Sequence, residues 1–98
     1  MAKVNSIEKI KRRSWTFSLE AAEAKEVFLV GDFNDWRPGK HPMRKDENGI
    51  WNKRVVLSPG HHEYKFLVDG QWKEDPRNHR RRPNRFGTYN SVISFSEG

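Results

Sequence analysis

Hydrophobic and polar residues alternate in several short stretches, a pattern typical of β-strands with one buried face. In residues 14–19 the apolar side chains Trp15, Phe17 and Leu19 alternate with serine and threonine. Residues 26–31 form a continuous apolar run, which suits a central strand. The same reasoning predicts strands over 14–19, 26–31, 50–57, 61–68 and 89–95, with Trp51, Val55, Leu57, Tyr64, Phe66, Val68, Tyr89, Ile93 and Phe95 on the inward faces. A further short strand over 71–73 is expected because the Asp69-Gly70 turn should fold the chain back.

Turn-forming residues separate these strands. Ser58-Pro59-Gly60 is a strong turn sequence, and Asp69-Gly70 has the chemistry of a two-residue type I′ hairpin turn. Residues 20–25 are too few for a stable helix and are predicted to be a connection. Short strands joined by turns, without a long helix, predict an all-β antiparallel sandwich.

Two longer segments are predicted to be loops. Residues 32–48 are rich in glycine, proline, asparagine and aspartate, with a short strand near Met43. Residues 75–85 contain two prolines and no apolar side chain. We therefore expect both segments to run over the surface of the sandwich.

Two tryptophans follow polar turns. Trp36 comes after Gly-Asp-Phe-Asn-Asp, and Trp72 comes after Asp-Gly-Gln. Because turns lie at the surface, these rings are poorly placed for a core. An exposed pair would offer flat aromatic faces to a flat apolar ligand face, such as that of a sugar ring. The alternative is that both rings pack on their own domain, as we expect for Trp15 and Trp51, which lie within alternating strands.

Positive charge is concentrated in two places. The formal net charge is +6, and residues 1–13 form a basic N-terminal arm. The second cluster has three interpretations: a solvated loop, a site for the phosphate of a nucleic acid or a phosphorylated glucan, or a docking site for an acidic partner protein. It comprises Arg77, Arg80, Arg81, Arg82 and Arg85.

The composition excludes several classes of function. The 98 residues allow one domain, and the absence of cysteine rules out disulfides and thiolate metal sites and suits a reducing compartment. No apolar run approaches the roughly 20 residues that span a bilayer, and the Met1 end lacks an apolar signal segment. We therefore expect a cytoplasmic protein without membrane contact. No metal-ligand spacing, phosphate loop or nucleophile elbow occurs, so no metal or cofactor is expected.

The carboxylates that follow Gly31 have a catalytic alternative. A pair such as Asp32 and Asp35 could in principle perform glycoside acid–base chemistry. That chemistry requires a cleft and a fixed separation, and the chain is far shorter than the catalytic barrel of about 250 residues that such enzymes use. We interpret residues 31–35 as a turn and expect no catalytic residue.

Three motifs occur in order along the chain. They are Val-Phe-Leu-Val-Gly-Asp-Phe-Asn-Asp-Trp at 27–36, Gly-His-His-Glu-Tyr-Lys-Phe-Leu-Val-Asp-Gly-Gln-Trp-Lys-Glu-Asp-Pro at 60–76, and Phe-Gly-Thr-Tyr-Asn-Ser-Val-Ile at 86–93. This set resembles the family 48 carbohydrate-binding module, which is the glycogen-binding domain of the AMP-activated protein kinase β subunit. Related modules precede the catalytic barrel in branching and debranching enzymes of glycoside hydrolase family 13. The resemblance runs from Trp15 to Phe95 and implies an early-set immunoglobulin-like sandwich, here over residues 14–98.

The resemblance also implies a binding site for α-1,4-linked glucan. Two tryptophans would grip the sugar, and Phe86, where the family often has leucine, would insert beside the sugar chain or stack on it. From the residues alone, Lys65 could equally be a solvated strand lysine, and Asn90 could simply close a turn. The implied carbohydrate-binding set is Trp36, Lys65, Trp72, Phe86, Thr88 and Asn90.

The resulting functional prediction is non-catalytic binding of glycogen or a starch-like maltodextrin, with a role in tethering a partner enzyme to the polymer. The alternative is an interaction module of the same fold that has lost sugar binding. It would use the basic residues 77–85 to bind an acidic protein or, less in keeping with the rest of the sequence, a nucleic acid.

Overall fold

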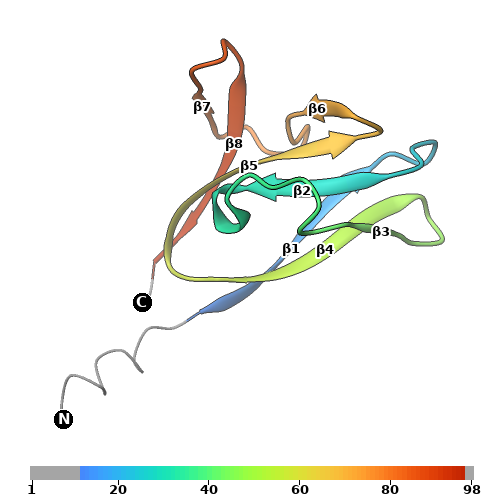
Figure 1. Cartoon of the computed structure of the whole chain (residues 1–98). Coiled ribbons are helices and arrows are strands. Elements are labelled where there is room, and N and C mark those ends of the chain that lie inside the picture. The colour runs from blue at the N-terminus through green and yellow to red at the C-terminus, as the bar shows by residue number, and fades with distance from the viewer. Residues whose placement is uncertain (1–11, 97–98) are drawn as a thin grey trace.

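The computed structural model describes residues 12–96 and consists of two antiparallel sheets packed against each other (Figure 1). The smaller sheet has the order β1–β4–β3, formed by Arg13–Glu20, Ile50–Leu57 and Arg44–Lys45. The larger sheet has the order β2–β5–β8–β7, with β6 also paired to β5. Its strands are Val27–Gly31, Gly60–Val68, Tyr89–Phe95, Arg81–Pro83 and Gln71–Lys73, and the 3₁₀ turn η1, Asp32–Asn34, follows β2.

This architecture confirms the predicted all-β, immunoglobulin-like antiparallel sandwich. The predicted short strand near Met43 corresponds to β3. The predicted basic arm lies almost wholly outside the described residues, and Arg13 already belongs to β1. Within residues 12–96, no helix is long and apolar enough to cross a membrane.

Alternating side chains of the two sheets form the core. Phe17 and Leu19 of β1 meet Leu29 of β2 and Tyr64 and Phe66 of β5, and all five are almost fully buried. The rings of Phe17 and Tyr64 contact edge to face, with centroids 4.8 Å apart. The predicted inward faces of 50–57 and 61–68 are thus confirmed. The other buried apolar residues of this cluster are Ala24, Val27, Met43, Trp51, Val55, Leu57 and Ile93.

Gly31 ends β2 at a point where β5 approaches closely. Its backbone is extended, with φ −165°, so any residue could adopt this conformation. The requirement for glycine is steric, because a Cβ here would lie 2.6 Å from the carbonyl oxygen of Glu63 and 2.7 Å from the ring of Phe33. The absence of a side chain lets β2 remain paired with β5 and pass directly into η1.

Two aromatic residues expected in the core are exposed instead. Trp15 shares a face with Phe17, but it lies near the start of β1 and stacks on Phe95 near the end of β8, with ring centroids 6.2 Å apart. Tyr89 lies at the other end of β8 under the guanidinium of Arg81, 4.5 Å from its ring centroid. Alternation gave the correct face of each strand, but both residues lie where the opposite sheet no longer covers that face.

The predicted loop over 75–85 was wrong in part, because Arg81–Pro83 form strand β7. β7 pairs with β8, and Arg82 lies opposite Asn90. All three β7 side chains are exposed, so no apolar alternation marks the strand. Pro83 is tolerated because β7 is an edge strand. The β7–β8 hairpin projects from the body of the sandwich (Figure 1).

Partly buried hydrogen bonds hold the start of this segment on the sheet. The hydroxyl of Tyr64 donates to Oδ2 of Asp75 at 2.7 Å and accepts from Nδ2 of Asn78 at 3.0 Å. Burial raises the pKa of Tyr64, and its hydrogen bond to Asp75 adds to the shift. Tyr64 therefore remains a hydrogen-bond donor. Asn78 also donates to the carbonyl of Val92 at 2.9 Å, which ties the segment to β8.

Candidate functional site

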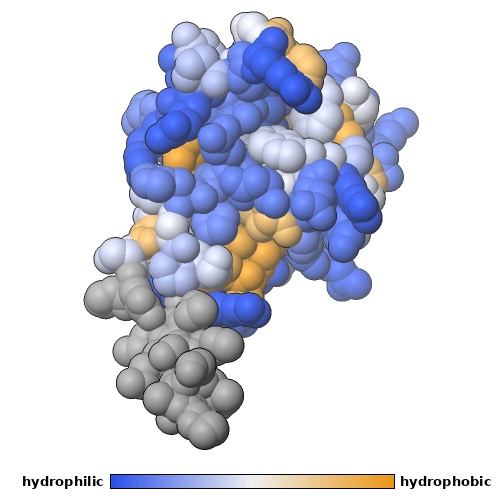
Figure 2. All heavy atoms as spheres, turned by 60° about the vertical axis from the view of Figure 1, so that its left-hand side comes forward, coloured by the Kyte–Doolittle hydropathy of each residue, from blue (hydrophilic) through white to orange (hydrophobic). Residues whose placement is uncertain are grey.

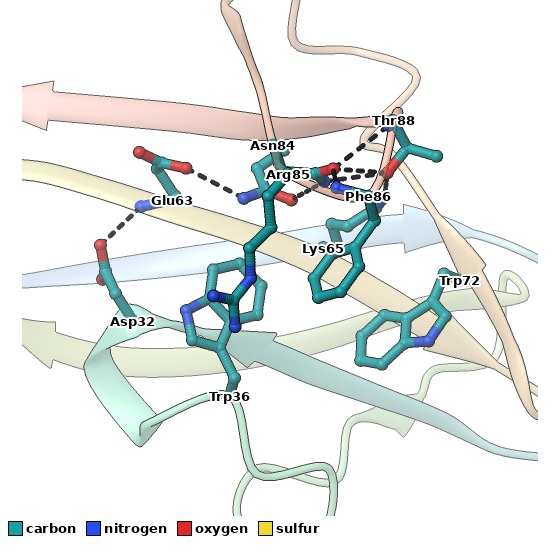
Figure 3. A pocket seen from close by; sticks show the side chains of 10 residues that line it. Asp32, Trp36, Glu63, Lys65, Trp72, Asn84, Arg85, Phe86 and Thr88 are labelled. Carbon is teal, nitrogen blue, oxygen red and sulfur yellow. Dashed lines mark hydrogen bonds between the residues drawn. The ribbon is translucent and has the colours of Figure 1, made fainter.

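A groove of about 730 Å³ lies on the outer face of the five-stranded sheet, opposite the core. Figure 3 shows Trp36 and Trp72 on the same face of the five-stranded sheet, with the turn between β7 and β8 over β5. The groove is lined by Asp32, Trp36, Glu63, Lys65, Trp72, Asn84, Arg85, Phe86, Thr88 and Asn90. The structure thus brings together all six residues of the predicted carbohydrate-binding set, from three separate sequence motifs.

Trp36 is presented by a tight turn that follows η1. Asp35 and Trp36 both have a left-handed backbone, with φ of 58° and 57°. This conformation costs an L-residue about 1–2 kcal/mol, because its Cβ comes close to the following carbonyl oxygen. The Trp36 N–H donates to the carbonyl of Gly31 at 2.9 Å and closes the turn. The backbone of Trp36 is therefore strained. Trp36 is 37% exposed, and its side chain lines the groove.

Asn34, only 3% exposed, holds this turn from the inside. Its Oδ1 accepts the N–H of Gly31 at 3.0 Å, and its Nδ2 donates to the carbonyl of Leu29 at 3.0 Å. These two bonds fix the orientation of the amide. Nδ2 also lies 2.8 Å from Nδ1 of His41, which must therefore be an acceptor without a proton.

The pKa of His41 is lowered from its ordinary value of 6.5, chiefly by burial, with smaller contributions from the charges of Lys53 and Lys40. Because the pKa in the folded state lies below that of the unfolded chain, the unfolded chain takes up the proton first. Above about pH 6.5, His41 therefore does not lower the free energy of unfolding. The free energy of unfolding falls as the pH is lowered below that value, toward the folded-state pKa.

A glutamine at this position can accept the Asn34 N–H without titrating. We expect His41→Gln to flatten the fall in the free energy of unfolding that occurs as the pH is lowered below about 6.5. Urea unfolding at each pH measures this. The control is His79→Gln, because His79 is an exposed histidine. We expect this variant to show the same pH-dependent fall in the free energy of unfolding as the wild type. Parallel curves for His41→Gln and the wild type would show that His41 is not the titrating group.

Trp72 lies on β6, and the hairpin turn before it determines its position. Asp69 and Gly70 have φ of 47° and 84°, which confirms the predicted type I′ turn. The carboxylate of Asp69 accepts the N–H of Glu26 at 2.8 Å and ties the hairpin to the residue before β2. The three-residue strand β6 is thereby fixed, and it holds an indole that is 51% exposed.

A network of polar side chains forms the floor between the two indoles. Lys65 is only 8% exposed, and its Nζ donates to Oγ1 of Thr88 at 3.0 Å. Nδ2 of Asn84 donates to the same Oγ1 at 2.8 Å and to Oδ1 of Asn90 at 3.0 Å. Asn90 in turn donates to Oε1 of Glu63 at 2.9 Å. Within residues 12–96 the Lys65 ammonium makes this one hydrogen bond, so two of its three N–H donors have no protein partner there.

The turn between β7 and β8 places an apolar ring above this floor. Oδ1 of Asn84 accepts the N–H groups of Phe86 at 2.9 Å and of Thr88 at 3.1 Å. Phe86 is largely exposed, and the guanidinium carbon of Arg85 lies 5.3 Å from its ring centroid. An apolar side chain held in such a position is available to a ligand in the groove.

Comparison with known proteins decides the family. The sequence model described as "Glycogen recognition site of AMP-activated protein kinase" matches residues 15–97. The chain belongs to this family. Membership makes it a non-catalytic carbohydrate-binding module and confirms the resemblance drawn from the three motifs.

Individual relatives of this glycogen-recognition module agree with the family. A stretch of 53 residues, 54% of the chain, is 49% identical to Protein PTST homolog 2, chloroplastic, of Arabidopsis thaliana and covers 10% of that protein. Over 76 residues, 74% of the chain, the identity to 5'-AMP-activated protein kinase subunit beta-1 is 42% for Sus scrofa and 41% for Homo sapiens. The chain covers 57% and 26% of those two sequences, so it spans only part of the length of these relatives.

Four residues that line the groove of this glycogen-recognition module were not predicted as site residues. They are Asp32, Glu63, Asn84 and Arg85. Glu63 could have been predicted, because strand alternation places it on the same face as Lys65. Asn84 could also have been predicted, because asparagine side chains often accept the backbone N–H two residues on at turns, here that of Phe86. Asp32 was interpreted only as part of a turn, and its place in the groove could not be predicted because its carboxylate accepts the N–H of Glu63, a residue 31 positions away.

The acidic residues of the groove already have structural partners. Oδ2 of Asp32 accepts the N–H of Glu63 at 2.9 Å, and Oε1 of Glu63 accepts from Asn90. In the part of the chain that the structure describes, no group of three or more His, Cys, Asp or Glu side chains could hold a metal ion. The groove therefore provides aromatic faces and hydrogen-bonding groups, which suit binding.

Proposed function

We propose that this glycogen-recognition module binds α-1,4-linked glucan in the groove, with Trp36 and Trp72 as platforms for the apolar faces of glucose rings. The observation that carries the proposal is that two exposed tryptophans line one groove, Trp36 with an exposed fraction of 37% and Trp72 with one of 51%. A tryptophan is highly buried on average. Two exposed rings in the same groove therefore call for a ligand that covers them.

The energy available from stacking matches moderate affinity. An indole buries at most about 150–250 Å², and the exposed part of one ring contributes on the order of 1–3 kcal/mol when a sugar covers it. Two rings together, with a few hydrogen bonds, support dissociation constants in the micromolar to millimolar range, where about −4 kcal/mol corresponds to 1 mM and about −8 kcal/mol to 1 µM.

The floor of the groove supplies what sugar hydroxyls need. A hydroxyl both donates and accepts, so it binds best where donors and acceptors alternate. Lys65 offers two open N–H donors, and Glu63 offers carboxylate oxygens beside it on the same face of β5. The network of Asn84, Thr88 and Asn90 fixes these groups before a ligand arrives, which lowers the entropic cost of binding.

Calorimetric titration with maltoheptaose and with cellohexaose tests this proposal. We expect maltoheptaose to bind in the micromolar to millimolar range and cellohexaose to bind at least about tenfold more weakly. The difference is expected because the β-1,4 chain is straight whereas the α-1,4 chain is curved. The two chains therefore present their ring faces to the indoles at different angles. Equal affinities for the two sugars, or no binding of maltoheptaose, would refute α-glucan recognition.

We further propose that the module tethers a partner enzyme to the polymer. Support comes from relatives that are named as subunits of a protein kinase and in which the matching segment is one part of a longer chain. The kinship with modules of glycoside hydrolase family 13 stays a prediction. A cytoplasmic location also stays a prediction, since two relatives are named as chloroplastic.

A further inference from the structure

The arginines of the basic segment divide between the two faces of β7. Arg81 points to the side of Tyr89, and its guanidinium lies 3.3 Å from a carboxylate oxygen of Glu74. Arg82 lies opposite Asn90 in the β7–β8 register, so it shares the face on which Asn90 lines the groove. Neighbouring residues of one arginine run thus have different surroundings.

Arg85 extends this positive charge into the groove itself. It lines the groove, and Figure 3 shows its side chain pointing from the β7–β8 turn toward Trp36. Among residues 12–96, the ion pairs are His62 with Asp32 and Arg81 with Glu74, so the charges of Arg82 and Arg85 are not neutralised within this range. Figure 2, which brings the side of β7 forward, shows mostly hydrophilic side chains over this part of the surface.

We propose that Arg82 and Arg85 form an anion subsite that binds a phosphate ester carried by the glucan in the groove. This inference rests on the proposed function, because the glucan places the ester. A guanidinium offers a planar pair of N–H donors that matches two phosphate oxygens. Both side chains are exposed and long, so they can approach one phosphate from the β7 wall while the sugar chain lies on the indoles.

The floor of the groove favours a phosphorylated glucan over a nucleic acid. The carboxylates of Asp32 and Glu63 line the same groove as Arg85. A nucleic acid would bring a phosphate with every nucleotide past these two negative charges, which repel it. A glucan with a single ester places one phosphate on the arginines and neutral hydroxyls on the carboxylates.

The test compares a maltodextrin that carries one 6-phosphate ester on an internal glucose with the unmodified maltodextrin of the same length. We expect the wild type to bind the phosphorylated form about fivefold more tightly at low salt, and less so as salt rises. The double variant R82Q/R85Q should bind the two forms equally. The double variant R44Q/R77Q loses the same charge at exposed arginines outside the groove and should keep the preference.

Each outcome separates this inference from the proposed function. If both maltodextrins bind the wild type equally, the anion subsite is wrong and glucan binding stands. If neither binds, the proposed function fails. Equal loss of the preference in R82Q/R85Q and R44Q/R77Q would show a general charge effect and overturn the subsite. An RNA oligonucleotide that binds more tightly than the phosphorylated maltodextrin, and through Arg82 and Arg85, would assign the site to nucleic acid instead.

Discussion

Replacing Trp72 with alanine is expected to weaken maltoheptaose binding about 10- to 100-fold, and replacing Trp36 should have an effect of the same order. Each substitution removes a proposed stacking platform, which would contribute on the order of 1–3 kcal/mol, and about 1.4 kcal/mol corresponds to a factor of ten. Trp72 is the more exposed of the two rings, so its removal disturbs the fold least. Calorimetric titration measures the affinity, and thermal unfolding shows whether the variants remain folded.

Trp15 provides a matched control for this experiment. Its exposed fraction, 37%, equals that of Trp36, but it does not line the groove and stacks on Phe95. Trp15→Ala should therefore keep the affinity of the wild type, although the loss of the stacked pair lowers its stability. If Trp15→Ala weakens binding as much as Trp36→Ala does, exposed aromatic rings in general, and not the groove, account for binding.

Asn34→Ala is expected to lower the free energy of unfolding by about 2–4 kcal/mol. The substitution leaves the N–H of Gly31 and the carbonyl of Leu29 without their buried partner. It also removes the side chain that holds the left-handed turn at Asp35 and Trp36. A second effect follows: the affinity for maltoheptaose should fall even at temperatures where the variant is folded, because Trp36 is no longer held in place.

Asn78→Ala separates these two effects. Asn78 also makes two hydrogen bonds to partly buried groups, but it holds the start of the segment over 75–85 and does not line the groove. Urea unfolding should show that both variants are destabilised, whereas only Asn34→Ala should lose affinity for maltoheptaose. Wild-type affinity in a folded Asn34→Ala protein would mean that the turn does not need Asn34 to position Trp36.

The longer strands could be predicted from the sequence because one face of each packs in the core, which requires apolar residues at alternating positions. β4 and β5 show this best, since Trp51, Val55 and Phe66 all face the core as expected. β7 could not be predicted, because only its backbone pairs with β8 and its side chains carry no apolar pattern. Trp15 and Tyr89 were misassigned because alternation gives the face of a strand and not the place where the opposite sheet ends.

The predicted binding residues could be proposed because turn chemistry and three motifs point to them. Other features of the groove depend on pairing between distant segments. Lys65 is buried because the β7–β8 turn brings Thr88 onto it, 23 residues away in sequence. Arg82 shares the groove face only through its register with Asn90. Neither relation can be read from local sequence, and both bear directly on what the groove can bind.

The most direct test of glucan binding follows the indole N–H resonances of the four tryptophans by NMR during a titration with maltoheptaose. The two that line the groove, Trp36 and Trp72, should shift with one common dissociation constant. Trp51, whose N–H donates to the carbonyl of Ala21 at 2.8 Å, and Trp15 should not move. Saturating sugar that leaves Trp36 and Trp72 unshifted, or that shifts Trp15 instead, would contradict the binding site proposed for this module.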